Sequence, residues 1–420
     1  MRNLKYKNQG SIEFEIILYS HTGKKLDISY NISQFEIIED VSNFCLVGSF
    51  MFIDVLGIKE FLPLIGGEKL KITYRTDETF DYVSNNFVIT KIGKENQSGD
   101  YIPRKSLQVF FSSELIVNSF KQSFSKSYNH KQPSYIVKDI YDNMLKSKKQ
   151  LIVEDTINTI SYIIPNCNPH KAIQYIMKRS LSSTYNDAGY LFFENANECN
   201  FISLQKMYNQ DAIFDIYFHK HFKNENERYT GYLGLPNYYE NIYTIDLLEE
   251  TRKGVYGSTI YVFDYAIGQF VKYSLNHQKT EKTNNIGNVI PIFSDYDAQE
   301  SSIMEFTDYI NDRLGNGVEY QKSIDEQAKI ELRNRVLYGS LNKNAFVAGF
   351  YGNSDLVCGK IVNVDFKSQE DHQLVNEKMT GKYFIKAIRN KTTVNDGYSQ
   401  IIMLTKPFYS ADSDNIMKRV

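Results

Sequence analysis

Apolar and polar residues alternate in several short stretches of the first quarter of the chain. Between Ile12 and Leu18, and again between Lys69 and Tyr74, every second residue is apolar. This period of two predicts strands of a sheet with one wet face. The stretch from Leu46 to Val55 is largely apolar on both faces, as in a strand covered on both sides. With a hairpin turn expected at Asn96 to Asp100, residues 11–112 predict antiparallel β structure.

The period changes to that of helices in residues 113–208. Apolar residues recur at i, i+1, i+4, i+5, i+8 and i+9 from Ile136 to Leu145, which is one face of a helix. A second helix is expected to start at Asn168 as N-cap, with Pro169 at its first position. A strand pair over 190–193 and 201–204 follows. This segment therefore predicts a small α+β domain.

The second half of the chain alternates between strand patterns and helix patterns. Strands are expected at 213–218, 242–247 and 259–263, a polar loop at 279–288, helices at 303–314 and 324–336, β structure over 338–408, and a polar tail at 409–420. Gly315-Asn316-Gly317 separates the two helical patterns and is a good stop signal.

Two three-strand segments, 292 residues apart when counted from Gly67 to Gly359, share one pattern. In each, a glycine leads into an alternating strand, and a polar loop, a second strand, a polar hairpin and a third strand follow. The strands are 67–74, 86–92 and 106–111 in one copy and 359–366, 382–388 and 399–404 in the other. Similarity at a distance is typical of a repeated unit. The sequence therefore predicts a duplicated β module, and a trimer of such chains would present six similar surfaces.

Composition and charge narrow the class of protein. The chain has 420 residues, enough for two to four domains, with 32 Tyr, 27 Phe and no Trp. Aromatic enrichment favours strands and protein interfaces. With a net charge of -2, the chain as a whole has no positive field that would attract nucleic acid or anionic lipid. We expect no signal peptide, no membrane span and four reduced cysteines, because Met1 to Gly10 is polar, no long apolar run exists and the cysteines form no CxxC pair.

Candidate catalytic and metal-binding residues are few and unspecific. His219 and His221 share one face of a predicted strand, but no third metal ligand is evident nearby. The acids Asp139, Asp142 and Glu154-Asp155 have no diagnostic spacing for general acid and base chemistry. No nucleophile elbow, phosphate loop or zinc-protease motif occurs. We therefore expect no catalytic residues, no metal and no cofactor.

The segment from Arg335 to Phe408 carries the most specific motifs of the chain. It contains Gly352-Asn353-Ser354-Asp355-Leu356, then Gly359, then Thr380-Gly381-Lys382-Tyr383-Phe384-Ile385 and Ile388-Arg389. The N-terminal part adds Glu36-Ile37-Ile38-Glu39-Asp40, a strand around Gly48-Ser49-Phe50, Gly57 to Leu62, and Ile65-Gly66-Gly67-Glu68-Lys69-Leu70. Together they resemble the baseplate hub proteins of contractile-tailed bacteriophages, a family related to the hub part of type VI secretion spike proteins. Asn390 and Thr380 depart from the histidine and serine common there.

The resemblance implies a mainly β fold with α+β insertions, in which two similar antiparallel β-barrel tube domains carry smaller insert domains. The expected division is 1–112 for the first barrel, 113–208 for the α+β insert, 209–252 and 338–408 for the second barrel, 253–337 for an insert with strands and two helices, and 409–420 for the tail. The structural residues of the family motifs would be Gly67, Glu68, Gly352, Asn353, Leu356, Gly359, Gly381, Tyr383 and Ile385.

The implied function is that of a structural virion protein and not of an enzyme. A homotrimeric, pseudo-sixfold ring would join the sixfold tail tube to the threefold central spike and form part of the channel for DNA ejection. Partners would be two further copies of the chain, a separate spike protein, the tail tube protein and neighbouring baseplate proteins, with DNA passing without specific binding and no membrane contact. Assembly would occur in the host cytoplasm. Two alternatives stay open: the hub of a genome-free phage-like contractile injection system, and a β-rich polysaccharide-acting enzyme or adhesin.

Overall fold

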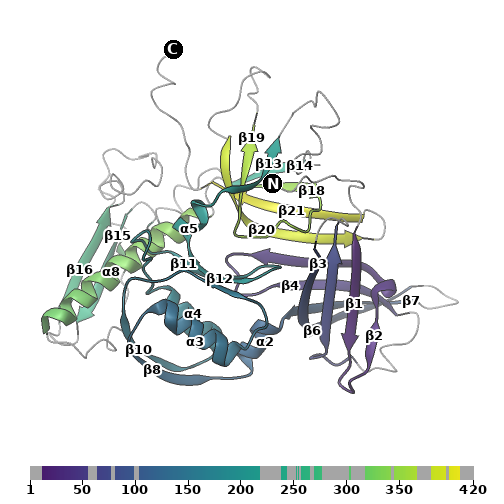
Figure 1. The fold of residues 1–420 in the computed structure, drawn as a ribbon, viewed down its shortest axis with the longest axis horizontal. Coiled ribbons are helices and arrows are strands. Elements are labelled where there is room, and N and C mark those ends of the chain that lie inside the picture. Colours follow the sequence, from purple (N-terminus) through teal and green to yellow (C-terminus); the bar gives the residue numbers. More distant parts are fainter. Residues whose placement is uncertain are drawn as a thin grey trace, which may run out of the picture.

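The computed structural model describes residues 12–54, 64–76, 81–98, 104–217, 238–243, 252, 254, 257–264, 269–276, 302–303, 317–341, 345–366, 380–393 and 397–406. Figure 1 shows a first group of strands in purple, a second group in yellow beside it, and a blue region of helices and short strands adjoining both. The predicted fold class, mainly β with α+β insertions, is confirmed.

The first β module contains seven strands, all paired antiparallel with their neighbours. They are β1 (Glu13–Tyr19), β2 (Lys25–Asp27), β3 (Ile32–Asp40), β4 (Val47–Asp54), β5 (Lys69–Arg75), β6 (Val83–Ser98) and β7 (Arg104–Ser113), and η1 (Ser29–Asn31) is a single 3-10 turn. Their order in the sheet is β3-β4-β7-β6-β5-β1-β2. The apolar positions of the alternating stretches, such as Ile16, Leu70 and Ile72, are buried in one core, which is what their period of two predicted.

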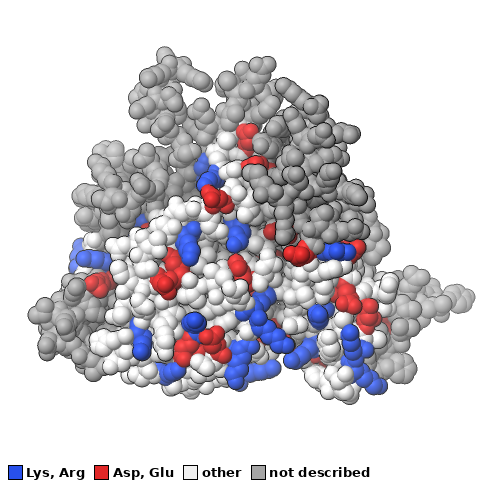
Figure 2. All heavy atoms as spheres, in the orientation of Figure 1, with Lys and Arg blue, Asp and Glu red and all other residues white. Residues whose placement is uncertain are grey.

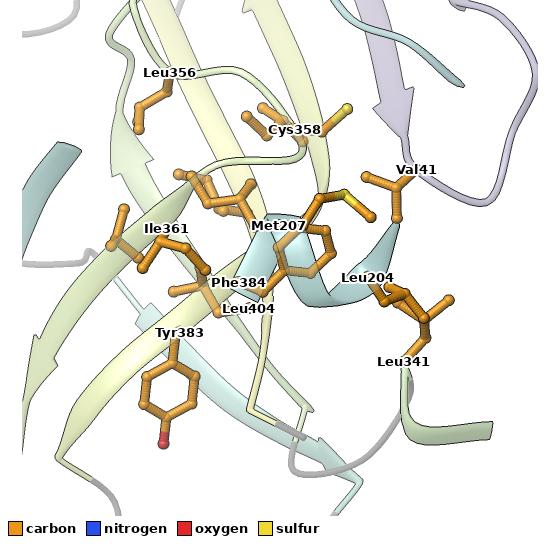
Figure 3. Packing of buried hydrophobic residues seen from close by; sticks show 14 of the residues in the cluster. Val41, Leu204, Met207, Leu341, Leu356, Cys358, Ile361, Tyr383, Phe384 and Leu404 are labelled. Atoms are coloured by element: carbon orange, nitrogen blue, oxygen red, sulfur yellow. The ribbon is translucent and has the colours of Figure 1, made fainter. Parts of the chain in front are cut away.

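The second β module contains β13 (Ala212–Tyr217), β14 (Tyr238–Tyr243), β18 (Ala345–Tyr351), β19 (Ile361–Asp365), β20 (Gly381–Thr393) and β21 (Gly397–Thr405). Their order is β13-β19-β20-β21-β18-β14. A second core lies on this module and takes side chains from elsewhere in the chain. Figure 3 shows Val41, Leu204, Met207 and Leu341 grouped beside Phe384 and Leu404 of this module.

The two modules have the same strand order. Matched one for one along the chain, β1, β3, β4, β5, β6 and β7 correspond to β13, β14, β18, β19, β20 and β21, and the order β1-β5-β6-β7-β4-β3 becomes β13-β19-β20-β21-β18-β14. Two differences exist: β2 has no counterpart among the described strands of the second module, and β1 is antiparallel to β5, whereas β13 is parallel to β19. Both modules belong to one continuous sheet, because β3 pairs with β20.

The α+β insert lies between the modules in sequence. Its elements are α2 (Glu114–Phe120), β8 (Phe124–Lys131), α3 (Pro133–Ile140), the π-helical turn η2 (Tyr141–Leu145), β9 (Leu151–Val153), β10 (Ile160–Cys167), α4 (Pro169–Met177), β11 (Tyr190–Glu194), β12 (Cys199–Ser203) and α5 (Leu204–Tyr208). The Asn168 side chain accepts a hydrogen bond from the Lys171 N–H at 2.9 Å, so the predicted N-cap is confirmed. The insert has its own core, which includes Ile136, Ile140 and Ile173.

A further group of elements consists of β15 (Gly257–Asp264), β16 (Gln269–Asn276), β17 (Ser302–Ile303) and α8 (Gly317–Ser340). In Figure 1 it lies at the opposite end of the molecule from the first module. Helix α8 reaches back to the rest of the chain: its Arg333 forms two hydrogen bonds of 2.8 and 2.9 Å with Asp187 of the insert. The Tyr338 hydroxyl donates to the Tyr190 carbonyl at 2.8 Å.

Several sequence predictions need correction. The strand expected at 242–247 is β14 at Tyr238–Tyr243, so it begins at the paired tyrosines. Ile303 belongs to strand β17 and not to a helix, while 304–316 lie outside the described residues. Helix α8 continues to Ser340, so the return to β structure comes after 338. The segments 57–62, 279–288 and 409–420 lie outside the described residues, as do His219 and His221.

Candidate functional site at the module junction

The pairing of β3 with β20 joins the two modules. Seven consecutive residues of β20, from Ala387 to Thr393, lie opposite Asp40 to Gln34 of β3. The Arg389 guanidinium Nε donates to a carboxylate oxygen of Glu36 at 2.9 Å across this junction. A main-chain ladder of this length fixes the register and relative orientation of two sheets. The junction is therefore the part of the chain that sets the geometry of one module against the other.

Glu39 is a fully buried carboxylate near one end of this junction, opposite Ile388. One of its oxygens accepts the Ala196 N–H of the insert at 3.2 Å and the Cys358 N–H of the second module at 3.3 Å. The other accepts the Asn390 side-chain amide at 3.4 Å. Burial raises the pKa of Glu39 to about 7, and these hydrogen bonds only partly offset that effect. One side chain thus connects the first module, the second module and the insert.

A second polar network continues from Asn390 into the motif turn of the second module. The Asn390 side-chain oxygen accepts the Tyr398 hydroxyl at 2.8 Å and the Gln400 amide at 2.7 Å. Gln400 in turn bonds both the N–H and the carbonyl of Asn353, at 2.8 and 2.9 Å. All four residues are nearly or fully buried. Asn390, which stands where the family commonly has histidine, therefore has a structural role here.

The motif turn 352–359 also reaches the first module. Thr76 and Ser354 share a hydrogen bond of 3.0 Å between their hydroxyls, and the Ser354 N–H donates to Thr76 Oγ1 at 3.0 Å. Val357 packs in the core of the first module, while Leu356 and Cys358 pack in the core of the second. Successive side chains of this turn therefore enter the two cores alternately, so the turn packs the cores of the two modules against each other.

The insert is attached to the first module through Glu194. This buried carboxylate accepts the Leu46 N–H at 3.2 Å and the Ser113 hydroxyl at 2.9 Å, and it lies 3.0 Å from Lys149 Nζ. Lys149 Nζ also donates to the Asn195 carbonyl at 2.7 Å. Neither the Glu39 nor the Glu194 contact was foreseen, because the partners of both acids are far away in sequence.

Gly67 and Gly359 occupy matching positions in the two modules. Both have positive φ, +91° and +88°. The Gly67 N–H donates to the Ile89 carbonyl at 2.8 Å and the Gly359 N–H donates to the Ile385 carbonyl at 2.9 Å. The return bonds, from the Ile89 N–H to the Glu68 carbonyl and from the Ile385 N–H to the Lys360 carbonyl, are each 2.9 Å. The two glycines therefore make the same turn into the same strand pair.

The other predicted motif residues divide between these turns and strand β20. The buried Glu68 side chain accepts the N–H groups of Ile65 and Gly66 at 2.8 and 3.0 Å, which closes the first-module turn. Gly381 (φ +136°) begins β20, and Tyr383 packs edge-on against Phe346 with ring centroids 5.0 Å apart. Ile385 is fully buried. The second-module motif residues thus divide between the turn 352–359 at the junction and the first half of β20, which pairs with β19, whereas Gly67 and Glu68 lie in the first module.

Replacing Gly359 by alanine is expected to destabilise the protein more than the same change at Gly67. At Gly359 a new Cβ would lie 2.7 Å from the ring of buried Phe193, whereas at Gly67 it would meet only His21 at 3.5 Å. Both changes carry the cost of an L residue at positive φ, so their difference isolates the ring clash, which we expect to be roughly 2 kcal/mol. Urea unfolding of both variants measures it. Gly23→Ala (φ +80°, nothing within 4 Å) is the control, and equal losses in all three would contradict the prediction.

The chemistry of the described residues offers no assembled reactive site. No group of three or more His, Cys, Asp or Glu side chains is placed to hold a metal among them. Asp139 accepts Lys126 Nζ at 2.6 Å and is therefore engaged in an ion pair. Burial raises the pKa of the Cys199 thiol to about 12 and raises that of Cys45 as well, so both thiols stay protonated. No helix of the described part is long and apolar enough to cross a membrane.

One cleft of about 400 Å³ lies between the loop after β3 and helix α4. Its lining combines polar and apolar side chains: the ring centroids of Phe44 and Phe192 are stacked 4.6 Å apart, and Phe44 is edge-on to His170 at 4.5 Å. Burial lowers the pKa of His170, so the neutral imidazole packs as an aromatic ring.

Solved structures share this arrangement of elements. The chain matches a tail protein from Neisseria meningitidis MC58 with a TM-score of 0.54 and 10% identity, covering 94% of this chain and 96% of that one. It matches the 43 kDa tail protein of prophage MuSo2 from Shewanella oneidensis with a TM-score of 0.53 and 12% identity, covering 94% and 98%. A component of the type VI secretion system of E. coli matches at 0.44 with 8% identity, covering 91% and 76%. No protein-family model matches the chain, and no curated protein matches it by sequence.

These likenesses concern the fold. The chain has the fold of phage tail proteins, and the resemblance that the sequence motifs indicated is confirmed at that level. The two matches with the higher TM-scores extend over nearly the whole of this chain and of the matched chains, so the fold includes the insert as well as the β modules.

Proposed function

We propose that the protein is the central hub of a contractile-tail baseplate, a structural component and not an enzyme. The observation that carries this proposal is the identical strand order of the two β modules. A chain with two equivalent modules offers two equivalent surfaces, so three copies in a ring would offer six. Such a ring fits a sixfold tail tube on one side and a threefold spike on the other.

Each expected domain would have its own place in the ring. The tube domains would be residues 1–112 and the combined 209–252 and 338–408, and their curled sheets would form the wall of the ring. The inserts 113–208 and 253–337 would lie outside this wall, where they leave the channel open. The rigid junction at Glu39 and Asn390 would hold the two modules of each chain at the angle that the ring requires.

The charge distribution supports passage of DNA without retention. On the face in Figure 2, basic and acidic residues are interspersed over the described surface, and the whole chain has a net charge of -2. Affinity for DNA rises with the number of ordered Lys and Arg contacts to phosphates. A genome-free injection device would use the same hub, and a polysaccharide-acting enzyme remains the alternative of another class. The spike, the tube protein and neighbouring baseplate proteins would be the partners, in the virion tail.

The proposal predicts a trimer. By light scattering, we expect the purified chain to have the mass of three copies, or of three copies plus the spike when its spike protein is bound. By cryo-electron microscopy, it should appear as a ring with six similar lobes. A chain that stays monomeric in the presence of the spike would count against the hub. Depolymerisation of a polysaccharide by the purified protein would instead favour the enzyme.

A further inference from the structure

Strand β20 keeps one partner along its first edge and changes partner halfway along its second edge. The first edge pairs with β21 from Phe384 to Thr393. On the other edge, Gly381 to Phe384 pair with β19, and after a bulge between Ile385 and Ala387 the rest of the strand pairs with β3. The junction between the modules thus depends on the second half of a long strand that has left its own module.

Strand β6 is built in the same way. One edge pairs with β7 from Phe87 to Ser98, with a bulge between Ile89 and Lys91, the same place as the bulge in β20. A second register shift, between Ile92 and Glu95, has no counterpart in the β20–β21 ladder. The other edge pairs with β5 only from Val83 to Val88. Among the described residues, the stretch from Lys91 to Ser98 has no partner on that edge. It corresponds to the stretch of β20 that pairs with β3.

Strand β14 is the counterpart of β3 and also has one open edge. It pairs with β18 as β3 pairs with β4. Among the strands that the structure describes, nothing pairs with the second edge of β14, whereas the second edge of β3 is bound to β20. The chain therefore has one complete junction, β20 with β3, and the two unpaired halves of a second one.

We propose that β6 of one copy pairs antiparallel with β14 of a second copy, in the manner of β20 with β3. This inference rests on the homotrimer proposed above and names its contact. The register is obtained in two steps. Residues of β6 are matched to residues of β20 through their partners in β7 and β21, and residues of β14 are matched to residues of β3 through their partners in β18 and β4. The known pairing of β20 with β3 then gives the pairing of β6 with β14. It places Glu95 opposite Asn241, Asn96 opposite Glu240, Gln97 opposite Tyr239 and Ser98 opposite Tyr238 of the second copy.

The proposed contact has the right symmetry for a closed ring. It joins different surfaces of successive copies, so it is a heterologous contact that repeats head to tail. In the ring, each junction between modules would be either β20 with β3 inside a chain or β6 with β14 between chains, and all would be alike. It also covers two strand edges that would otherwise invite uncontrolled pairing. A second copy of this chain is therefore the occupant that both edges fit.

The experiment is disulfide trapping in the full-length chain. Opposite residues of antiparallel strands have Cα atoms about 4.5–5.5 Å apart, within disulfide range. Asn96→Cys with Glu240→Cys should give covalent dimers and trimers on a non-reducing gel after mild oxidation. Glu36→Cys with Lys391→Cys, the matched pair inside one chain, should react without joining chains. Asn96→Cys with Lys25→Cys, on the distant strand β2, sets the background.

Two further measurements make the result decisive. Co-expression of the Asn96→Cys and Glu240→Cys single variants should give covalent dimers and no covalent trimer, because each chain then has one engineered thiol at the contact. Should the first double variant fail to fold, as judged by circular dichroism, Gln97→Cys with Tyr239→Cys tests the next pair of the same register.

The outcomes separate this contact from the hub proposal. A trimer by light scattering with trapping above the background supports both. A trimer in which neither designed pair is trapped above the background overturns the β6–β14 contact and leaves the hub standing. A chain that stays monomeric even with the spike overturns both.

Discussion

Gly352→Ala is expected to destabilise the protein by about 3 kcal/mol or more, because the side chain would overlap the ring of Tyr398. A Cβ at Gly352 would lie 1.7 Å from one ring carbon of Tyr398 and 1.9 Å from another. Tyr398 has no exposed surface, and its hydroxyl donates to Asn390, so the ring has no free space to move into. Chemical unfolding followed by circular dichroism measures the loss.

A double-mutant cycle tests the cause of this loss. Tyr398→Leu removes the ring atoms that the new Cβ would meet, at the cost of a cavity and of the hydrogen bond to Asn390. Gly352→Ala should therefore cost at least about 2 kcal/mol less in the Tyr398→Leu background than in the natural chain, since contacting residues are not additive. If Gly352→Ala costs the same in both backgrounds, the ring contact is not the reason that glycine is needed.

The sequence predicted the fold well where local patterns coincide with tertiary structure. The alternation around Ile72 marked a strand with one more buried face, and Asn168 before Pro169 marked a helix start. At Ile16 to Leu18 three consecutive apolar residues are buried, so β1 is covered on both faces there. Gly67 and Gly359 indicated the duplication, because each glycine makes a positive-φ turn that few other residues allow. Strand β14 was misplaced because its stability comes from pairing with β18, a strand 100 residues later, and not from its own apolar pattern.

The junction was less predictable than the strands that form it. Glu39 belongs to an acidic motif in which Glu36 is ion-paired with Arg389 and Glu39 is buried. The two acids lie three residues apart, so alternation places them on opposite faces of β3, with Glu39 on the buried face of Phe35 and Ile37. Alternation does not identify the groups that bond Glu39, because they come from Ala196 and Cys358. The position of Glu39 on the same strand face as Phe35 and Ile37 is the signal that could have raised the question of burial. Its partners depend on the assembled fold.

Glu39→Gln is expected to remove a pH dependence that the natural chain has between about pH 4.5 and 7. Burial raises the pKa of Glu39 from 4.5 to about 7 in the folded protein. The folded state therefore holds a proton on this group that the unfolded state has lost, so the contribution of Glu39 to stability is present below pH 4.5 and is lost as the pH rises through 7. A shift of this size corresponds to about 3 kcal/mol. The glutamine carbonyl can still accept the N–H groups of Ala196 and Cys358, and the amide does not titrate.

The measurement is urea unfolding of both proteins from pH 4.5 to 8. The free energy of unfolding of Glu39→Gln, relative to the natural chain, should rise by about 3 kcal/mol across this range, because only the natural chain pays for a buried charge. Glu13→Gln is the control with little expected change: hydrogen bonds from Arg75 and Tyr82 lower the pKa of the exposed Glu13 below its usual 4.5, so its contribution is already nearly complete above pH 4.5 and is lost only at lower pH. A pH-independent difference for Glu39→Gln would mean that Glu39 ionises normally at the junction. Its hydrogen bonds to the insert and the second module would then outweigh its burial.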